Sequence, residues 1–339
     1  MLNYCTHAIE DFSNVLRLAD QTGNPVFSQS SVDRLIMEEL VGLLHKAVKF
    51  HLPVNGEILE HSKASEIISK DIFRLPFPVC ALEYEYTSFN PEMISQGKIH
   101  VPRRIALCME YEAVANTLIG RAALSVLPDI ETCGGIIMIP FFWGNYDGAS
   151  SWTVTYAGLV ALRQDLDESR PALFYSMTPD STDKPAIIRV GVSPLVVLPN
   201  LLQVFLGKAS MNQRDKDEIS NQIMMDCAEE FYSMSNLMVA LSCSNVGLQD
   251  SLASLKLNKK RQQNGKPPMF DYKEVVVQVE KNGDKSHSVS FSGGRSCREH
   301  LRRGHIRRLH GGEKRIWIQS TIVNAGKGPS PNLNYKVKS

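Results

Sequence analysis

The sequence predicts an α+β fold in which helices pack on a mostly antiparallel sheet, with a small basic β-rich module at the C-terminal end. Apolar residues recur at helical spacing near the start of the chain and again over 215–242. Short runs of β-branched and aromatic residues, bounded by glycine or proline, lie between these segments and are typical of strands. Charge is also divided unevenly between the two ends of the chain.

Two helices are expected before the first strand. Ser30 and Ser31 precede Val32 and a run of apolar residues spaced three or four apart, which predicts a helix with a serine N-cap. A second helix is predicted over about 57–73. We expect it to end before Pro76, because the residue that precedes a proline disfavours the helical region.

Strands are predicted in the middle of the chain from β-branched, aromatic and alternating residues. These segments are 79–86, with 99–110 as its expected partner, then 135–143, 152–161 and 187–192. A turn at 144–148, which is rich in glycine, asparagine and aspartate, separates the third segment from the fourth. The short connections favour antiparallel pairing.

The clearest helical pattern covers about 215–242. Apolar residues recur there at spacings of three and four, namely Ile219, Ile223, Cys227, Phe231, Met234, Met238 and Leu241. The methionines suggest either an adaptable binding groove or a stripe that faces the core. We favour the core-facing stripe.

The composition changes after residue 255, and we divide the chain into an acidic α+β body (1–255), a basic linker (256–270) and a basic β-rich module (271–339). The linker is polar and ends in two prolines. In the module, a strand is predicted at 273–280 and a second at 287–291, on either side of an Asn-Gly turn signal. A basic segment at 299–309, a turn at 310–314 and a strand at 315–323 then predict a hairpin.

The charge asymmetry suggests a polyanionic partner for the C-terminal part. Residues 256–339 contain 19 lysines and arginines against 6 aspartates and glutamates, whereas residues 1–255 contain 18 against 30. Formal charges of +13 and −12 follow for the two parts. The basic module therefore either binds a partner such as nucleic acid or docks on the acidic body, and both interpretations stay open.

The predicted hairpin supplies the candidate binding residues. Arginine suits phosphate, since its planar fork makes bidentate contacts and keeps its charge. An aromatic side chain beside such cations can stack a base. The residues expected to contact nucleic acid are Arg302, Arg303, His305, Arg307, Arg308, Arg315 and Trp317. His305 is also a candidate general acid or base for RNA cleavage, although a contact to phosphate or a place in the sheet is the favoured role.

Other polar patterns point to no cofactor and no metal. Glu83 and Glu85 share one face of a predicted strand, with Glu110 and Glu112 expected nearby, and paired carboxylates of this kind can hold Mg²⁺. We favour solvent-facing edge charges for these acids. The glycine-rich segments lack a Walker lysine or a dinucleotide pattern, and the seven widely spaced cysteines suit buried thiols in a reducing cytoplasm.

Short patches at 72–86 and 256–323 resemble proteins of tailed bacteriophages that have no established activity. The most specific patch runs from His300 to Leu309 (HLRRGHIRRL) and continues in the Arg315–Ile318 segment (RIWI). This resemblance implies a phage or mobile-element origin and action in the cytoplasm of a bacterial host. It implies no functional residues.

Three functional hypotheses follow. The favoured one is an accessory protein that binds DNA or RNA through the basic hairpin and has no catalysis of its own. The second is a nuclease, a ribonuclease or toxin-like enzyme that uses His305; Gly304-His305 before a basic strand resembles the HicA-type toxins. The third is a protein-binding inhibitor of a host factor. No membrane partner is expected, because the most apolar runs are too short or are broken by proline.

Overall fold

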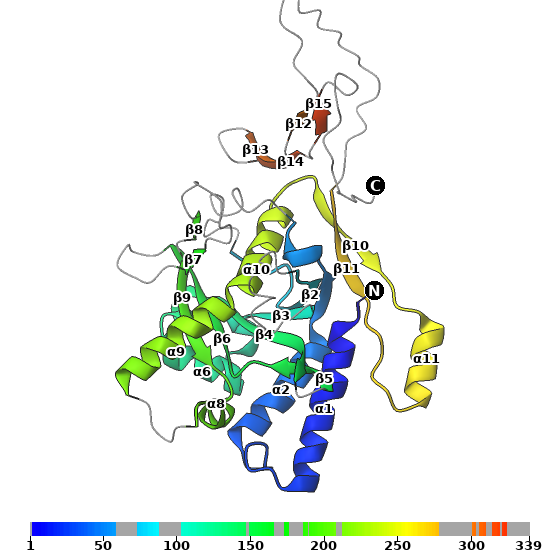
Figure 1. The fold of residues 1–339 in the computed structure, drawn as a ribbon. Coiled ribbons are helices and arrows are strands. Elements are labelled where there is room, and N and C mark those ends of the chain that lie inside the picture. The colour runs from blue at the N-terminus through cyan, green and yellow to red at the C-terminus, as the bar shows by residue number, and fades with distance from the viewer. Residues whose placement is uncertain are drawn as a thin grey trace, which may run out of the picture.

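One mixed sheet forms the centre of the protein (Figure 1). A computed structural model describes residues 2–58, 73–87, 103–146, 149–165, 173–175, 186–188, 190–207, 212–277, 300–302, 305–309, 314–318 and 321–323. The strands of the central sheet are β1 (Val48–His51), β2 (Val79–Glu85), β3 (Arg103–Glu110), β4 (Gly135–Tyr146), β5 (Ala149–Val154), β6 (Ala157–Asp165), β9 (Val190–Val196), β10 (Val246–Ser251) and β11 (Tyr272–Val277).

The strand order confirms a mostly antiparallel sheet. Its main path runs β10-β11-β1-β2-β3-β4-β6-β9, and β5 pairs beside β4. Among the described strands, the parallel pairings are those of β1 with β2 and of β1 with β11. A separate short pair consists of β7 (Leu173–Tyr175) and β8 (Ala186–Ile188).

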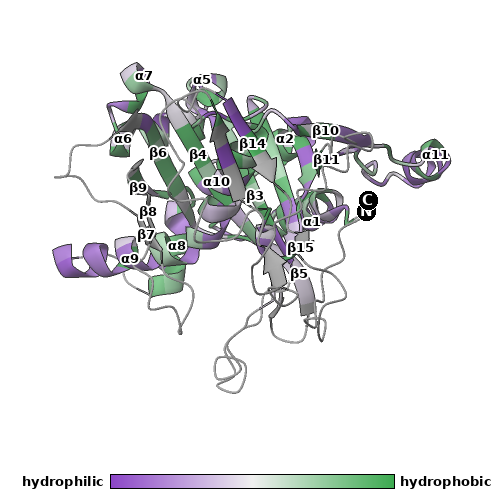
Figure 2. Cartoon of the chain, turned by 90° about the horizontal axis from the view of Figure 1, so that it is seen from above, coloured by the Kyte–Doolittle hydropathy of each residue, from purple (hydrophilic) through white to green (hydrophobic). Residues whose placement is uncertain are grey.

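Helices cover both faces of this sheet, which gives three layers and confirms the α+β class. The helices are α1 (Tyr4–Thr22), α2 (Val32–Lys46), α5 (Tyr111–Val114), α6 (Leu118–Val126), α7 (Ile130–Cys133), α8 (Pro199–Leu206), α9 (Gln213–Asp226), α10 (Ala228–Leu241) and α11 (Leu255–Gln263), with a 3-10 turn η1 (Val54–Gly56). Hydropathy colouring shows apolar residues concentrated in the central strands, whereas α9 is mostly hydrophilic (Figure 2).

Alternate residues of the same strand serve two separate cores, as the period of a strand requires. Ala81 and Ile105 lie in the core beneath α1 and α2. Their neighbours Leu82 and Ala106 lie in the core on the other face, with α10. Because both faces are buried, the central strands are nearly continuous in apolar sequence rather than alternating.

The first two helices differ in how their N-termini are capped. The helix predicted behind Ser31 is confirmed as α2, and Ser31 accepts a hydrogen bond from the N–H of Asp33. The sequence did not predict α1. The N-cap residue of α1 is Asn3, and its side chain accepts no hydrogen bond from the helix. The first N–H groups of α1 are instead satisfied by a carboxylate from the sheet, described below.

Two of the predicted elements need correction. The long helix over 215–242 is two helices, because Cys227 between α9 and α10 leaves ideal helical geometry (φ −96°, ψ −2°). The strand predicted over 152–161 is two strands, β5 and β6, which both pair antiparallel with β4 but are interrupted at residues 155–156, where the register shifts. The helix predicted at 57–73 lies almost entirely outside the described residues. The methionine stripe faces the core as predicted, with Met234 and Met238 buried.

Part of the predicted C-terminal region belongs to the central sheet. The strand expected at 273–280 forms as β11, and its described neighbours are β1 and β10. The predicted linker contains α11, whose side chains are mostly exposed and which projects beyond β10 and β11 (Figures 1 and 2). The division into body, linker and module stays a prediction, as does the strand at 287–291, which lies outside the described residues.

The last described strands form two short pairs. β12 (His300–Arg302) pairs antiparallel with β15 (Thr321–Val323), and β13 (His305–Leu309) pairs antiparallel with β14 (Lys314–Ile318). The second pair is the predicted basic hairpin. No helix in the described part of the chain is long and apolar enough to cross a membrane.

Candidate functional site

The β13–β14 hairpin holds most of the residues that the sequence singled out. His305 pairs with Ile318, Arg307 with Ile316, Arg308 with Arg315, and Trp317 with Ile306. Arg302 lies on β12 opposite Thr321, so it belongs to the neighbouring strand pair. Arg303 lies outside the described residues. The backbone therefore gathers the described members of the predicted set into two strand pairs that are close in the chain.

The two faces of the hairpin have different surroundings. Arg307 and Leu309 alternate along β13 and pair with Ile316 and Lys314, so these four side chains share one face. Arg307 and Lys314 on that face are exposed. Arg315 lies on the opposite face and is partly buried. The sequence did not select Lys314, which was assigned to a turn.

Arg315 joins the hairpin to the body. Its carbonyl oxygen accepts hydrogen bonds from the backbone N–H and the hydroxyl of Ser244, at 2.9 and 3.1 Å. Its Nε is buried and has no hydrogen-bond partner among the described residues. Burial raises the pKa of nearby Cys243 to about 11, and the Arg315 guanidinium opposes that rise. The backbone of β14 thus contacts Ser244, just after α10, and Arg307 and Lys314 lie on the hairpin face opposite to the Arg315 side chain.

A second basic surface lies on the segment 252–270, which we call the basic arm. Lys256, Lys259 and Lys260 of α11 are exposed and follow helical spacing, so they form one cluster. Two contacts hold the arm in shape. Asn258 donates to and accepts from the backbone of Met269, at 2.9 and 2.8 Å. The arm therefore contains an ordered helix with exposed lysine side chains within the segment that the sequence predicted to be an exposed basic linker.

The basic arm is fastened to α1. The guanidinium of Arg261 forms an ion pair with Glu10 and also donates to the carbonyl oxygen of Pro267. The hydroxyl of Thr6 donates to the carbonyl oxygen of Pro268 at 2.8 Å. These contacts place the base of the arm against the first turns of α1.

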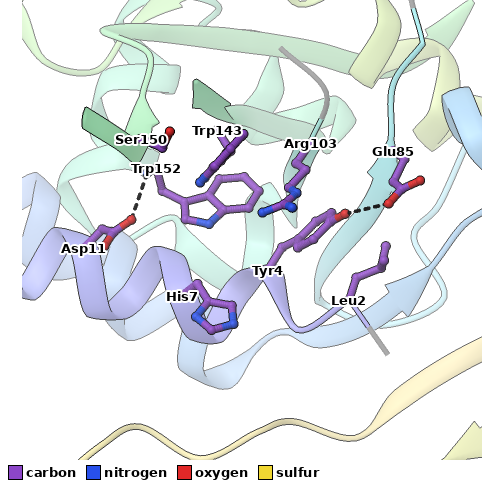
Figure 3. Close-up of a pocket in the computed structure, with 9 residues that line it drawn as sticks. All are labelled: Leu2, Tyr4, His7, Asp11, Glu85, Arg103, Trp143, Ser150 and Trp152. Atoms are coloured by element: carbon purple, nitrogen blue, oxygen red, sulfur yellow. Dashed lines mark hydrogen bonds between the residues drawn. The ribbon is translucent and has the colours of Figure 1, made fainter. Parts of the chain in front are cut away.

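Next to these turns lies a cavity of about 480 Å³, which we call the aromatic pocket (Figure 3). Its lining comes from three parts of the fold that are far apart in sequence. It consists of Leu2, Tyr4, His7, Asp11, Glu85, Arg103, Trp143, Ser150 and Trp152. The sequence did not predict a binding site at these residues, and Glu85 was interpreted as an edge charge.

Simple periodicities bring the lining together. Tyr4, His7 and Asp11 lie at spacings of three and four, so they share one face of α1. Trp143 and Trp152 are register partners of β4 and β5. Glu85 and Arg103 are likewise register partners, at the ends of β2 and β3. Each pair is close because of strand geometry, but only the tertiary fold brings the pairs to one cavity.

The floor of the pocket is aromatic. Tyr4 and Trp152 are 5% and 4% exposed, and their ring centroids are 5.3 Å apart. The guanidinium of Arg103 lies over the Trp143 ring, 4.4 Å from its centroid, and 5.7 Å from that of Tyr4. Cation–π attraction of this kind orients a flexible arginine at the rim.

Two carboxylates complete the rim. Asp11 accepts a hydrogen bond from the backbone N–H of Trp152 at 2.9 Å, and Glu85 accepts a long one from the Tyr4 hydroxyl at 3.4 Å (Figure 3). Burial raises the pKa of Tyr4 to about 12, and Glu85 adds to the rise. Tyr4 is therefore protonated at neutral pH and acts as a donor. The rim presents both acceptors and a cation to the cavity.

Glu83 is not a solvent-facing edge charge, so that interpretation was wrong. Its side chain is fully buried, and it accepts hydrogen bonds from the backbone N–H groups of Tyr4 and Cys5, at 2.8 and 2.7 Å. It also accepts one from the Tyr272 hydroxyl at 2.6 Å. Burial raises the pKa of Glu83, and these hydrogen bonds oppose the rise. Glu83 therefore caps α1 from the sheet.

Glu110 and Glu112 have a structural partner of their own. Both form ion pairs with Arg163, which also donates to the carbonyl oxygen of Phe73. Glu110 lies at the opposite end of β3 from the Glu85 partner Arg103, so the four acids do not form one cluster. Within the described residues, no group of three or more metal-binding side chains is present.

Comparisons with known proteins found no match to this chain. The chain matches no family model, no curated protein and no solved structure. The geometry described above is therefore the basis of the functional argument.

Proposed function

We propose that the protein is an accessory nucleic-acid-binding protein without catalysis of its own, which contacts phosphates through the exposed face of the β13–β14 hairpin. The observation that carries this proposal is the division of the hairpin into two faces. Arg315 contacts the body, whereas Arg307 and Lys314 share the exposed face. Cations held on a hairpin suit a polyanion with regularly spaced phosphates. A hairpin is already ordered, so binding does not require a disordered tail to become ordered.

The basic arm supports the same function. Lys256, Lys259 and Lys260 add exposed positive charge on a projecting helix, and Arg261 is already paired with Glu10. Phosphate contacts from two surfaces would give affinity without sequence preference. A phage or mobile-element origin, with action in the cytoplasm of a bacterial host, belongs to this proposal and rests on the resemblance of the HLRRGHIRRL block.

The test is equilibrium binding to labelled single-stranded DNA, double-stranded DNA and single-stranded RNA over a range of salt concentrations. We expect binding that weakens steeply with salt, because each neutralised phosphate releases counterions. The double variant Arg307→Ala/Lys314→Ala removes two exposed cations. It is expected to lower the slope of log K against log salt by about one per lost contact.

The matched control is Arg214→Ala/Lys216→Ala, which removes the same charge from the exposed side of α9. This control is expected to bind like the wild type. Absence of binding to all three nucleic acids at about 50 mM salt would contradict the proposal. So would a hairpin variant whose affinity and salt slope equal those of the control.

A further inference from the structure

We propose that the aromatic pocket binds a guanine base of a nucleic-acid strand, an inference that rests on the proposed function and names the base that it recognises. The shape of the pocket suits a planar ligand. The buried rings of Tyr4 and Trp152 offer planar surfaces around one cavity. Planar surfaces of this kind stack on the face of a base, and stacking contributes affinity with any base.

The hydrogen-bonding groups of the rim select among planar ligands. Ionised carboxylates only accept hydrogen bonds, so Glu85 and Asp11 call for a ligand that brings N–H donors. Guanine carries two adjacent donors on its Watson–Crick edge, N1–H and the N2 amino group, which suit one carboxylate. Uracil and thymine have a single such donor, and adenine presents an acceptor at N1 beside its amino group.

Arg103 also favours guanine over the other bases. Arginine binds the O6 and N7 acceptors of guanine through its planar fork, and this is the commonest specific contact to a base. The guanidinium already lies over Trp143, which sets the plane in which its N–H groups point. A carboxylate for the donor edge and an arginine for the acceptor edge together match guanine among the common bases.

A cationic ligand is the main chemical alternative for a pocket with aromatic rings and two acids. The Arg103 guanidinium lies over the rings of both Trp143 and Tyr4. A second cation would have to displace it or accept like-charge repulsion at close range. A neutral planar base meets neither cost, so the geometry favours the base.

The position of the pocket connects it to the phosphate-binding surfaces. His7 lines the pocket, and its Nδ1 lies 3.6 Å from the carboxylate of Glu10. Glu10 in turn pairs with Arg261 at the base of the basic arm. A strand whose phosphates follow the lysines of α11 therefore has a path across the first turns of α1 to the pocket.

The experiment uses the full chain and free nucleosides, which carry no phosphate and so report on the pocket rather than on the hairpin. Equilibrium dialysis is carried out with guanosine, inosine, adenosine and uridine. We expect guanosine to bind at least about tenfold more tightly than adenosine and uridine, with inosine weakened by loss of the N2 amino group. Glu85→Gln is expected to remove most of the preference for guanosine, and Arg103→Ala to weaken guanosine binding.

Glu85 and Arg103 are exposed, so these substitutions leave the core intact. The control Glu131→Gln changes an exposed acid on α7 by the same chemistry and is expected to change nothing. Equal affinity for all four nucleosides, or an unaltered preference in Glu85→Gln, would overturn the guanine assignment. If no nucleoside binds while polynucleotide binding is intact, the pocket proposal fails alone. If Arg307→Ala/Lys314→Ala keeps full polynucleotide affinity while guanosine still binds, the proposed hairpin function fails alone.

Discussion

The hydroxyl of Tyr272 donates to Oε1 of Glu83 at 2.6 Å, and this contact ties the last strand of the central sheet to the first helix of the chain. The same carboxylate accepts the first two N–H groups of α1, from Tyr4 and Cys5. An acid placed at a helix N-terminus satisfies orphan donors and interacts favourably with the helix dipole. Glu83 is thus the point at which α1, β2 and β11 are joined.

Glu83→Ala is expected to destabilise the protein by several kcal/mol, on the order of 3 or more, because it leaves three buried donors without an acceptor. Tyr272→Phe removes one donor to a buried carboxylate and is expected to cost about 1.5–3 kcal/mol. Urea unfolding measures both. Glu85→Ala, which changes the exposed acid two residues along β2, is the control and is expected to change stability by less than about 1 kcal/mol. Equal losses for Glu83→Ala and Glu85→Ala would show that Glu83 does not cap α1.

Lys49 makes the free energy of unfolding depend on pH, and the direction of this dependence follows from its pKa. It is 3% exposed, it donates to the carbonyl oxygen of His45, and burial lowers its pKa from 10.5 to about 8. Between these two values the unfolded chain binds more protons than the folded one at this residue. Stability contributed through Lys49 therefore rises with pH across this window.

Lys49→Met removes this titration, so its stability relative to the wild type is expected to fall as pH rises from about 8 to about 10.5. The change across the window is on the order of 3 kcal/mol. Urea unfolding at several pH values measures the difference. Lys46→Met, which changes an exposed lysine close by in the chain, is the matched control for the loss of a lysine side chain. Parallel pH curves for Lys49→Met and the wild type would contradict the assignment.

The local patterns predicted those elements whose signals are themselves local. The serine cap and the apolar spacing behind it identified α2, and the apolar runs identified β2, β3 and β4. In contrast, α1 carries Cys5, Ile9 and Phe12 at helical spacing but begins without a side-chain cap of its own. Its cap comes from Glu83, which lies 78 residues from Cys5 in the sequence. A single-sequence pattern cannot supply that partner, and the same distance hid the burial of Glu83.

The two candidate sites differ in the same way, since only one of them is formed by residues that are contiguous in the sequence. The hairpin was predictable, because its basic residues, its turn and its alternating strand are contiguous in sequence. The aromatic pocket was not, since its three sources, α1, the ends of β2 and β3, and the β4–β5 hairpin, meet only in the folded protein. One signal was available in the sequence: Trp143 and Trp152 lie on either side of the predicted turn at 144–148, and they are cross-strand partners in the fold.

Arg104 joins β3 to α10 through buried charges. Its guanidinium is 2.8 Å from Glu230 and 3.0 Å from Glu229, and Glu230 is fully buried. Removal of one member of a buried ion pair leaves an uncompensated charge, which typically costs about 3–5 kcal/mol. The Tyr84 hydroxyl also donates to Glu230, at 3.0 Å, so the site needs an acceptor even when the charge is removed.

Arg104→Met is therefore expected to destabilise the protein by about 3–5 kcal/mol in urea unfolding. Adding Glu230→Gln removes the orphan charge and keeps an acceptor for Tyr84, so the double variant is expected to recover at least half of that loss. Arg103→Met, one residue earlier and exposed, is the control and is expected to have little effect. If the two substitutions instead add their separate costs, Arg104 acts through packing alone and the charge pairing contributes nothing to the attachment of α10.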